Sequence, residues 1–281
     1  MEIQIIGVIG AGAMGSGIAQ VSIEAGYTVF LQDINENSLL KAKAGIEKNF
    51  NKMVGKGKMT EADMTAALAH LICTTNLLTA CKDADLIIES VFENLEIKQD
   101  MFREFERMCR PDTILASNTS ALPITEIGSV IKRKDKVIGL HFMNPVPMMK
   151  GLEIIRGQLT SDETLATTMD YVEKIGKEAA MAVDYAGFIV SRLLNVLVNE
   201  TIKLIEEGNT PEDIDKAMQL CAGHPMGPCK LMDLSGLDIS LHGMETLERD
   251  FGPKYKPHPM LKKRVLAGLL GMKSGEGFYK Y

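Results

Sequence analysis

Three glycines near the start of the chain have the spacing of a phosphate-binding turn. Gly10, Gly12 and Gly15 form a GxGxxG motif between an apolar run, residues 5–9, and a helix-like segment, residues 14–25. The first glycine would permit a tight turn, the second would let a pyrophosphate approach the backbone, and the third would let helix and strand pack closely. The helix N-terminus would supply N–H groups and a positive dipole. The cofactor-binding turn therefore comprises Gly10, Gly12, Ala13, Met14 and Gly15.

Asp33 has the position expected of an acid that binds a ribose. It follows a second apolar run, residues 28–31, and lies roughly 20 residues beyond Gly10, the usual separation in dinucleotide-binding motifs. Its carboxylate could hydrogen-bond a free 2′-hydroxyl and would repel a 2′-phosphate, which favours NAD over NADP. A packing turn followed by a surface aspartate is the alternative, but the strand, turn, helix and strand context favours a dinucleotide site.

A histidine and a glutamate lie in two apolar runs that are joined by a short turn. His141 lies in residues 137–142, and Glu153 interrupts residues 152–155. Alternation along a strand would place Glu153 opposite its apolar neighbours, either in solvent or buried with a partner. A lone histidine at a strand end is more often structural, but the turn at 144–147 would bring these two side chains together. A glutamate that fixes the imidazole tautomer would make His141 a better general base.

Four short polar side chains, residues 117–120, follow another apolar run at 113–116. At the carboxyl end of a strand, such side chains can line a ligand site. They can equally cap a helix near Thr125, and the sequence leaves both interpretations open.

A sheet covered by helices must position these residues. Apolar runs alternate with helix-length segments up to about residue 185, a pattern typical of a parallel sheet. We expect strands at residues 5–9, 28–31, 71–74, 85–89, 113–116, 137–142, 152–155 and 179–183. After Gly187 the apolar spacing becomes helical, and only the tail at 277–281 suggests another strand. We therefore predict an α/β domain over residues 1–185 and a mostly helical domain over residues 186–281.

Composition and charge exclude several classes of protein. The chain has 281 residues, of which 46% are hydrophobic and 24% charged, so it can bury a sizeable core and is not disordered. Its net charge of −6 argues against nucleic-acid and membrane-surface partners. Residues 3–23 carry no charge, but glycines and polar residues dilute this stretch too much for a membrane span or a signal peptide.

The five cysteines form no CxxC pair, and neither they nor the five histidines have zinc-ligand spacing. We expect free thiols and no metal. Free thiols are typical of a reducing compartment, so we expect a cytoplasmic protein.

Seven segments spread over essentially the whole chain carry a resemblance to a known family: GAGAMGSGIAQ, VFENLEIK, ASNTS, HFMNPVPMMKGLEI, GFIVSRLL, AGHPMGP and KSGEGFYKY. With these segments the chain resembles the short-chain L-3-hydroxyacyl-CoA dehydrogenases, in particular the bacterial 3-hydroxybutyryl-CoA dehydrogenases. It implies a Rossmann-type, mostly parallel sheet and an all-helical C-terminal domain for substrate binding and dimerisation. The implied reaction is reversible hydride transfer between NAD and an (S)-3-hydroxyacyl-CoA, in a homodimer.

The resemblance also implies roles for residues near the reacting atoms. His141 would be the general base and Glu153 its orienting partner. Ser120 would contact the substrate oxygen and the nicotinamide, and Asn144 would help hold the nicotinamide and the substrate. The family has a catalytic asparagine where this chain has Ser191, in GFIVSRLL. Serine is shorter and lacks the amide, although its hydroxyl can still donate to a substrate oxygen.

Four lysine and glutamate positions match binding positions of the family. Glu93, Lys98 and Lys273 would line the NAD site, and Lys56 would lie near the coenzyme A phosphates. Without the resemblance, the lysines of residues 52–58 would be interpreted as a solvated face.

Three other functions stay open at this point. A relative could act on a free hydroxy acid or polyol acid, although the lysines of residues 52–58 favour an acyl-CoA. An NAD-binding protein with impaired catalysis is a second alternative, because Ser191 departs from the family pattern. A module of a larger β-oxidation enzyme is disfavoured, because no hydratase-like segment is present.

Overall fold

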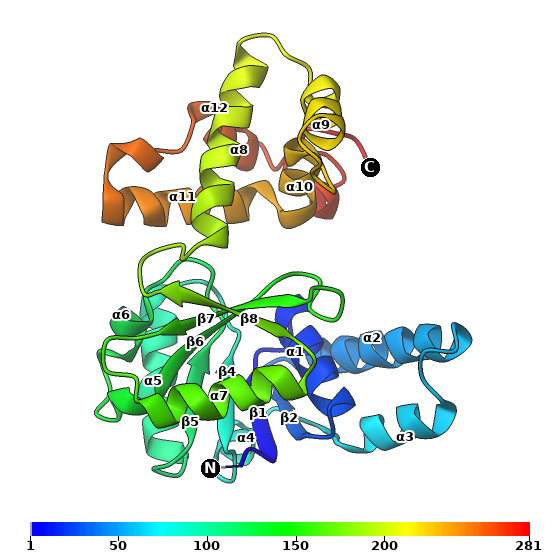
Figure 1. The fold of residues 1–281 in the computed structure, drawn as a ribbon, viewed down its shortest axis with the longest axis vertical. Coiled ribbons are helices and arrows are strands. Elements are labelled where there is room, and N and C mark those ends of the chain that lie inside the picture. The colour runs from blue at the N-terminus through cyan, green and yellow to red at the C-terminus, as the bar shows by residue number, and fades with distance from the viewer. Residues whose placement is uncertain (1) are drawn as a thin grey trace. The chain divides into compact units, whose positions relative to one another are not determined.

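The computed structural model describes residues 2–281. It divides into two compact units, one that ends at Asp184 and one that spans Tyr185–Tyr281. Within residues 2–281, all eight strands belong to the first unit, and the second unit is built from helices (Figure 1).

The first unit is organised around one eight-stranded sheet with the order β3-β2-β1-β4-β5-β6-β7-β8. Its neighbouring strands are parallel except for β6 and β7, which are antiparallel. The prediction of a mostly parallel sheet is confirmed, with strand ends shifted by one residue at most. The strands are β1 Ile5–Ile9, β2 Thr28–Gln32, β3 Leu71–Thr74, β4 Leu86–Glu89, β5 Ile114–Ser117, β6 Val137–Phe142, β7 Gly151–Arg156 and β8 Glu178–Val183.

Helices cover both faces of this sheet, so its central strands are buried on both sides and mostly apolar. Every residue of β4 and β5 is buried. Most of these helices begin at a side chain that accepts a backbone N–H, such as Asn35, Thr60, Asn94 and Ser161. The helices are α1 Ala13–Glu24, α2 Glu36–Gly55, α3 Glu61–Ala69, α4 Leu77–Cys81, α5 Leu95–Met108, α6 Ile124–Gly128 and α7 Asp162–Lys174, with a 3₁₀ turn at Lys134–Lys136.

The second unit has its own apolar core, in which Ile202, Cys229, Leu237 and Leu261 are completely buried. No helix within residues 2–281 is both long and apolar enough to cross a membrane. All five cysteines are free thiols, as predicted. The helices are α8 Val190–Glu206, α9 Pro211–Leu220, α10 Pro228–Ser235, α11 Leu237–Phe251 and α12 Pro259–Leu266, with 3₁₀ turns at Pro253–Tyr255 and Met272–Ser274.

The strand expected at residues 277–281 is wrong. The tail makes only isolated bridges, from Gly271 to Glu276 and from Glu276 to Lys280. Its backbone is held instead by the buried Asp233, which accepts the N–H groups of residues 278 and 279 at 2.8 Å. A carboxylate therefore satisfies N–H groups that a neighbouring strand would otherwise bind.

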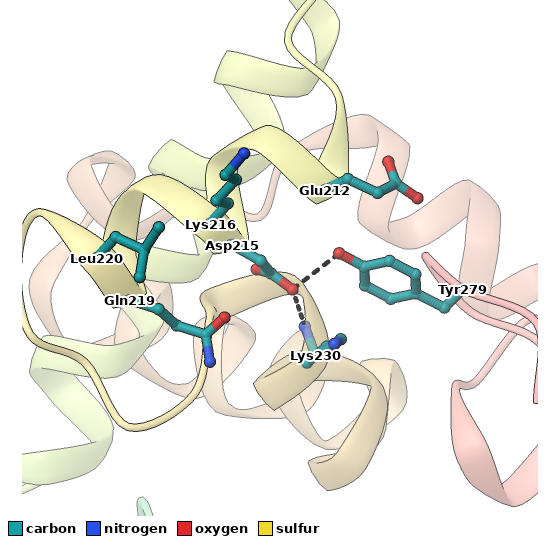
Figure 2. A pocket seen from close by; sticks show the side chains of 7 residues that line it. All are labelled: Glu212, Asp215, Lys216, Gln219, Leu220, Lys230 and Tyr279. Carbon is teal, nitrogen blue, oxygen red and sulfur yellow. Dashed lines mark hydrogen bonds between the residues drawn. The ribbon is translucent and has the colours of Figure 1, made fainter.

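A second buried carboxylate, Asp215 on α9, links three segments of the helical unit. It accepts the N–H groups of Cys229 and Lys230 at the start of α10, and the Tyr279 hydroxyl at 2.8 Å (Figure 2). Burial and the Asp215 carboxylate raise the pKa of Tyr279, so the tyrosine stays a neutral donor. Gly227 is required beside it, because a Cβ there would lie 2.3 Å from the Asp215 side chain.

We expect Asp215→Ala to lower the free energy of unfolding by about 3 kcal/mol, because one buried and two partly buried donors lose their acceptor. Tyr279→Phe removes one of these hydrogen bonds and should cost about 1 kcal/mol. Urea denaturation followed by circular dichroism measures both. Equal small effects would show that Asp215 does not join these segments.

Candidate active site

The glycine turn has the geometry that its sequence predicts. Gly10 has a φ of 103°, and a Cβ there would lie 2.5 Å from the carbonyl oxygen of Ser90. A Cβ at Gly15 would lie 1.7 Å from the Gly10 oxygen. At Gly12 a Cβ would meet no atom within 4 Å, so the backbone there is open to a ligand. No side chain caps α1, which begins at Ala13, and its first N–H groups suit an anion such as pyrophosphate.

Asp33 lies against this turn, directly after β2. Its Oδ2 accepts the N–H of Ala11 at 2.8 Å, and its Oδ1 accepts the N–H of Asn35 at 2.9 Å. The turn is also tied to β2 by the N–H of Gly10, which donates to the carbonyl of Gln32 at 2.7 Å. The structure thus joins the candidate pyrophosphate turn and the candidate ribose acid, and these residues fit NAD.

His141 and Glu153 are direct partners across the antiparallel strands β6 and β7. Their side chains are buried, and His141 Nδ1 lies 2.7 Å from Glu153 Oε2. Burial decides between the two positions that strand alternation allowed for Glu153: it is paired inside the protein, not solvated. An imidazole that donates Nδ1–H to a carboxylate can take up a proton at Nε2, and the carboxylate stabilises the resulting imidazolium.

A buried ion network lies at the ends of β4 and β5. Lys98 on α5 and Glu89 on β4 are both 0% exposed, and the Lys98 Nζ lies 2.8 Å and 3.0 Å from the two Glu89 carboxylate oxygens. The same Nζ lies 3.4 Å from Glu93 Oε2. Glu89 is not among the site residues predicted from the sequence. The sequence feature that could have identified it is a glutamate at the end of an apolar strand, followed by a lysine on the buried face of the next helix.

Neighbouring charges and hydrogen bonds determine the protonation states of Lys98 and Glu93. Burial by itself would lower the pKa of Lys98, but the Glu89 and Glu93 carboxylates raise it above its ordinary value. Burial by itself would raise the pKa of Glu93, but the Lys98 ammonium and hydrogen bonds from residues 119–121 lower it. Lys98 and Glu93 are therefore both ionised at neutral pH.

The polar cluster at 117–120 organises this edge and does not cap the next helix. Ser117 donates to Glu89 at 2.6 Å, and Asn118 accepts the N–H of residue 142 at 3.0 Å. Thr119 donates to Glu93, while the exposed Ser120 gives its N–H to Glu93 at 2.9 Å. The first N–H groups of α6 are bound by Asp184.

Of the four remaining predicted residues, three are exposed and Ser191 is partly buried. In the first unit, Asn144 follows β6 and Lys56 follows α2, and both are exposed. In the second unit, Ser191 lies partly buried in the first turn of α8, and Lys273 pairs with Asp238 at 2.5 Å. Residues 2–281 contain no cluster of three His, Cys, Asp or Glu side chains that could hold a metal.

Comparison with known proteins identifies the family. A model of the 3-hydroxyacyl-CoA dehydrogenase NAD binding domain matches residues 5–185, and a model of the C-terminal domain of the same family matches residues 187–281. A Bacillus subtilis protein named probable 3-hydroxybutyryl-CoA dehydrogenase is 46% identical over 283 residues, which are 100% of this chain and 98% of that protein. The 3-hydroxybutyryl-CoA dehydrogenase of Clostridioides difficile is 46% identical over 278 residues, with 98% and 99% coverage.

Solved structures agree with these matches. FadB2 of M. tuberculosis is 40% identical and superposes with a TM-score of 0.96, over 100% of both chains. (S)-3-hydroxybutyryl-CoA dehydrogenase PaaH1 from Ralstonia eutropha is 38% identical, with a TM-score of 0.93 over 100% of this chain and 99% of that one. Because the two family models together span nearly all of its length, the chain belongs to the 3-hydroxyacyl-CoA dehydrogenase family, with its NAD-binding domain in residues 5–185.

Proposed function

We propose that this protein interconverts an (S)-3-hydroxyacyl-CoA and the corresponding 3-oxoacyl-CoA, with 3-hydroxybutyryl-CoA as its substrate. The observation that carries the proposal is the buried contact of 2.7 Å between His141 and Glu153, in the same unit as the glycine turn and Asp33. The names of the Bacillus, Clostridioides and Ralstonia relatives support the choice of substrate.

Four side chains have separate roles in the hydride and proton transfers of this reaction. NAD, when bound, supplies the hydride acceptor. His141 takes the proton of the 3-hydroxyl group at Nε2 as the hydride leaves C3, and it returns that proton in the reductive direction. Glu153 accepts Nδ1–H throughout and stabilises the imidazolium. Ser120 and Ser191 hold the substrate oxygen in line with the nicotinamide.

Other residues hold the two ligands. The glycine turn with Ala13 and Met14, together with Asp33, Glu93, Lys98, Asn144 and Lys273, binds NAD. Lys56 meets the coenzyme A phosphates, which suits its exposed position after α2. We assign residues 186–281 to substrate binding and dimerisation, because helices of this unit expose apolar side chains such as Leu193 at 66% and Ile239 at 56%. The free thiols favour a cytoplasmic protein.

Replacing the base removes the proton acceptor but leaves the cofactor turn intact. We expect His141→Asn to lower kcat for acetoacetyl-CoA reduction by about 10²–10⁴ and to leave the dissociation constant of NADH unchanged. Initial rates and NADH fluorescence titration measure the two effects. Glu153→Gln should lower kcat less, because the imidazole itself remains. Retained turnover in His141→Asn would refute the assignment.

The carboxylate of Asp33 should set the choice of cofactor. In Asp33→Ser, we expect the ratio of kcat/KM for NADH to that for NADPH to fall by roughly tenfold or more, since a carboxylate no longer repels a 2′-phosphate. Glu36→Gln is the matched control, because it removes an exposed carboxylate at the start of α2. A preference that stays constant in Asp33→Ser would place the ribose elsewhere.

Residue 191 tests whether the departure from the family pattern limits the rate. We expect Ser191→Asn to raise kcat for acetoacetyl-CoA, and Ser191→Ala to lower it, because one well-placed donor to a reacting oxygen is worth about 10²–10³ in rate. Steady-state rates with NADH measure both variants. Equal rates in all three proteins would show that residue 191 does not contact the substrate. Turnover only in Ser191→Asn would favour an NAD-binding protein with impaired catalysis.

A further inference from the structure

Glu89 has no role in the proposed reaction, yet both of its carboxylate oxygens accept hydrogen bonds within the first unit. Its Oε1 accepts from Lys98 and from the N–H of Val91 at 2.7 Å. Its Oε2 accepts from Lys98 and from Ser117 at 2.6 Å. One carboxylate therefore ties together the end of β4, the end of β5 and the helix α5.

Through Lys98, Glu89 acts on a residue that a ligand can reach. The side chain of Glu93 is 24% exposed, whereas that of Lys98 is fully buried. Glu93 Oε1 accepts the N–H groups of Ser120 and Ala121 at 2.9 Å and 3.0 Å. Lys98 makes two short contacts with Glu89, whereas it makes a single contact of 3.4 Å with Glu93. The lysine is therefore anchored on the β4 side.

This network lies beside the cofactor turn. Glu89 is the register partner of Ile9, the last residue of β1 and the one before Gly10. The next residue, Ser90, provides the carbonyl oxygen that leaves no room for a Cβ at Gly10. Ligands of open parallel sheets bind beyond the carboxyl ends of the strands, which is where this network lies.

The network also has an unbalanced charge. Two carboxylates, Glu89 and Glu93, share one ammonium, Lys98, which leaves a formal charge of −1 in a region shielded from water. The oxidised and reduced cofactors carry the same pyrophosphate, but only the oxidised nicotinamide is positively charged. In the proposed function the nicotinamide lies at Ser120, whose N–H Glu93 binds, so a negative charge on this network stabilises NAD⁺ relative to NADH.

We propose that Glu89 is a positioning residue that anchors Lys98, fixes Glu93 and the turn carrying Ser120, and supplies negative charge that raises the affinity for NAD⁺ relative to that for NADH. The proposal rests on the proposed function, because it concerns the same cofactor site. It adds a residue that acts through Lys98 and sets the relative affinity for the two redox states.

The test is the ratio of the dissociation constants of NAD⁺ and NADH, measured by calorimetric titration of the full-length protein. Glu89→Gln removes the charge and keeps the shape of the side chain, so the affinity for NAD⁺ should fall by about fivefold relative to the affinity for NADH. Ser117→Ala is the matched control, because it removes a hydrogen bond to Glu89 and leaves the charge. It should leave the ratio unchanged, and thermal denaturation gives the stability of both variants.

A purely structural role for Glu89 would change both affinities together, and an unchanged ratio in a folded Glu89→Gln would overturn the proposal. If that variant does not fold, Glu93→Gln neutralises the same network at its partly exposed end. It should shift the ratio in the same direction, and no shift there would equally overturn the proposal. Failure of the unmodified protein to bind NADH or to reduce acetoacetyl-CoA would instead overturn the proposed function.

Discussion

A charge buried at the carboxyl ends of the strands of a parallel sheet must be paired with an opposite charge, and the first unit is arranged around this constraint. Helices cover both faces of the sheet, so every ionisable group buried in it needs a partner, and the Glu89–Lys98 pair lies at a strand end. There Glu89 and Lys98 are fully buried, and either of them alone would cost several kcal/mol. Each therefore fixes the other, and their contact joins the end of β4 to the start of α5. The glycine turn follows the adjacent strand β1 and shares this rigid edge.

The His141–Glu153 pair satisfies the same constraint in a different way. The network around Glu89 combines residues from two strands and a helix, whereas this pair forms across one short connection between β6 and β7. The reversal of direction at this point of the sheet puts the two side chains opposite one another. Because the carboxylate is buried, it cannot turn to water at low cost, and it keeps the imidazole in one orientation.

The sequence predicts what depends on local pattern. The strands were found because buried parallel strands are continuous apolar runs, the glycine turn because its motif is contiguous, and the His141–Glu153 contact because a short turn joins the two runs. Glu89 was missed because its partner lies on another element. Lys98 did carry a signal: with Phe102 and Phe105 it lies on the buried face of α5, so it requires an acid. The tail was misjudged because its partner is Asp233, a carboxylate on α10 far away in sequence.

Both units use carboxylates to hold backbone N–H groups. The exposure of each carboxylate distinguishes those that stabilise the scaffold from one that can contact a ligand. Asp215 and Asp233 are at most 3% exposed, and their oxygens accept from donors within their own unit. Glu93 binds the turn at residues 119–121 in the same manner, but its side chain is 24% exposed. A carboxylate enclosed by donors of its own unit, as Asp215 and Asp233 are, holds elements of the scaffold together. One that is anchored on one side by Lys98 and open on the other, at the edge that carries the glycine turn, can also contact a cofactor.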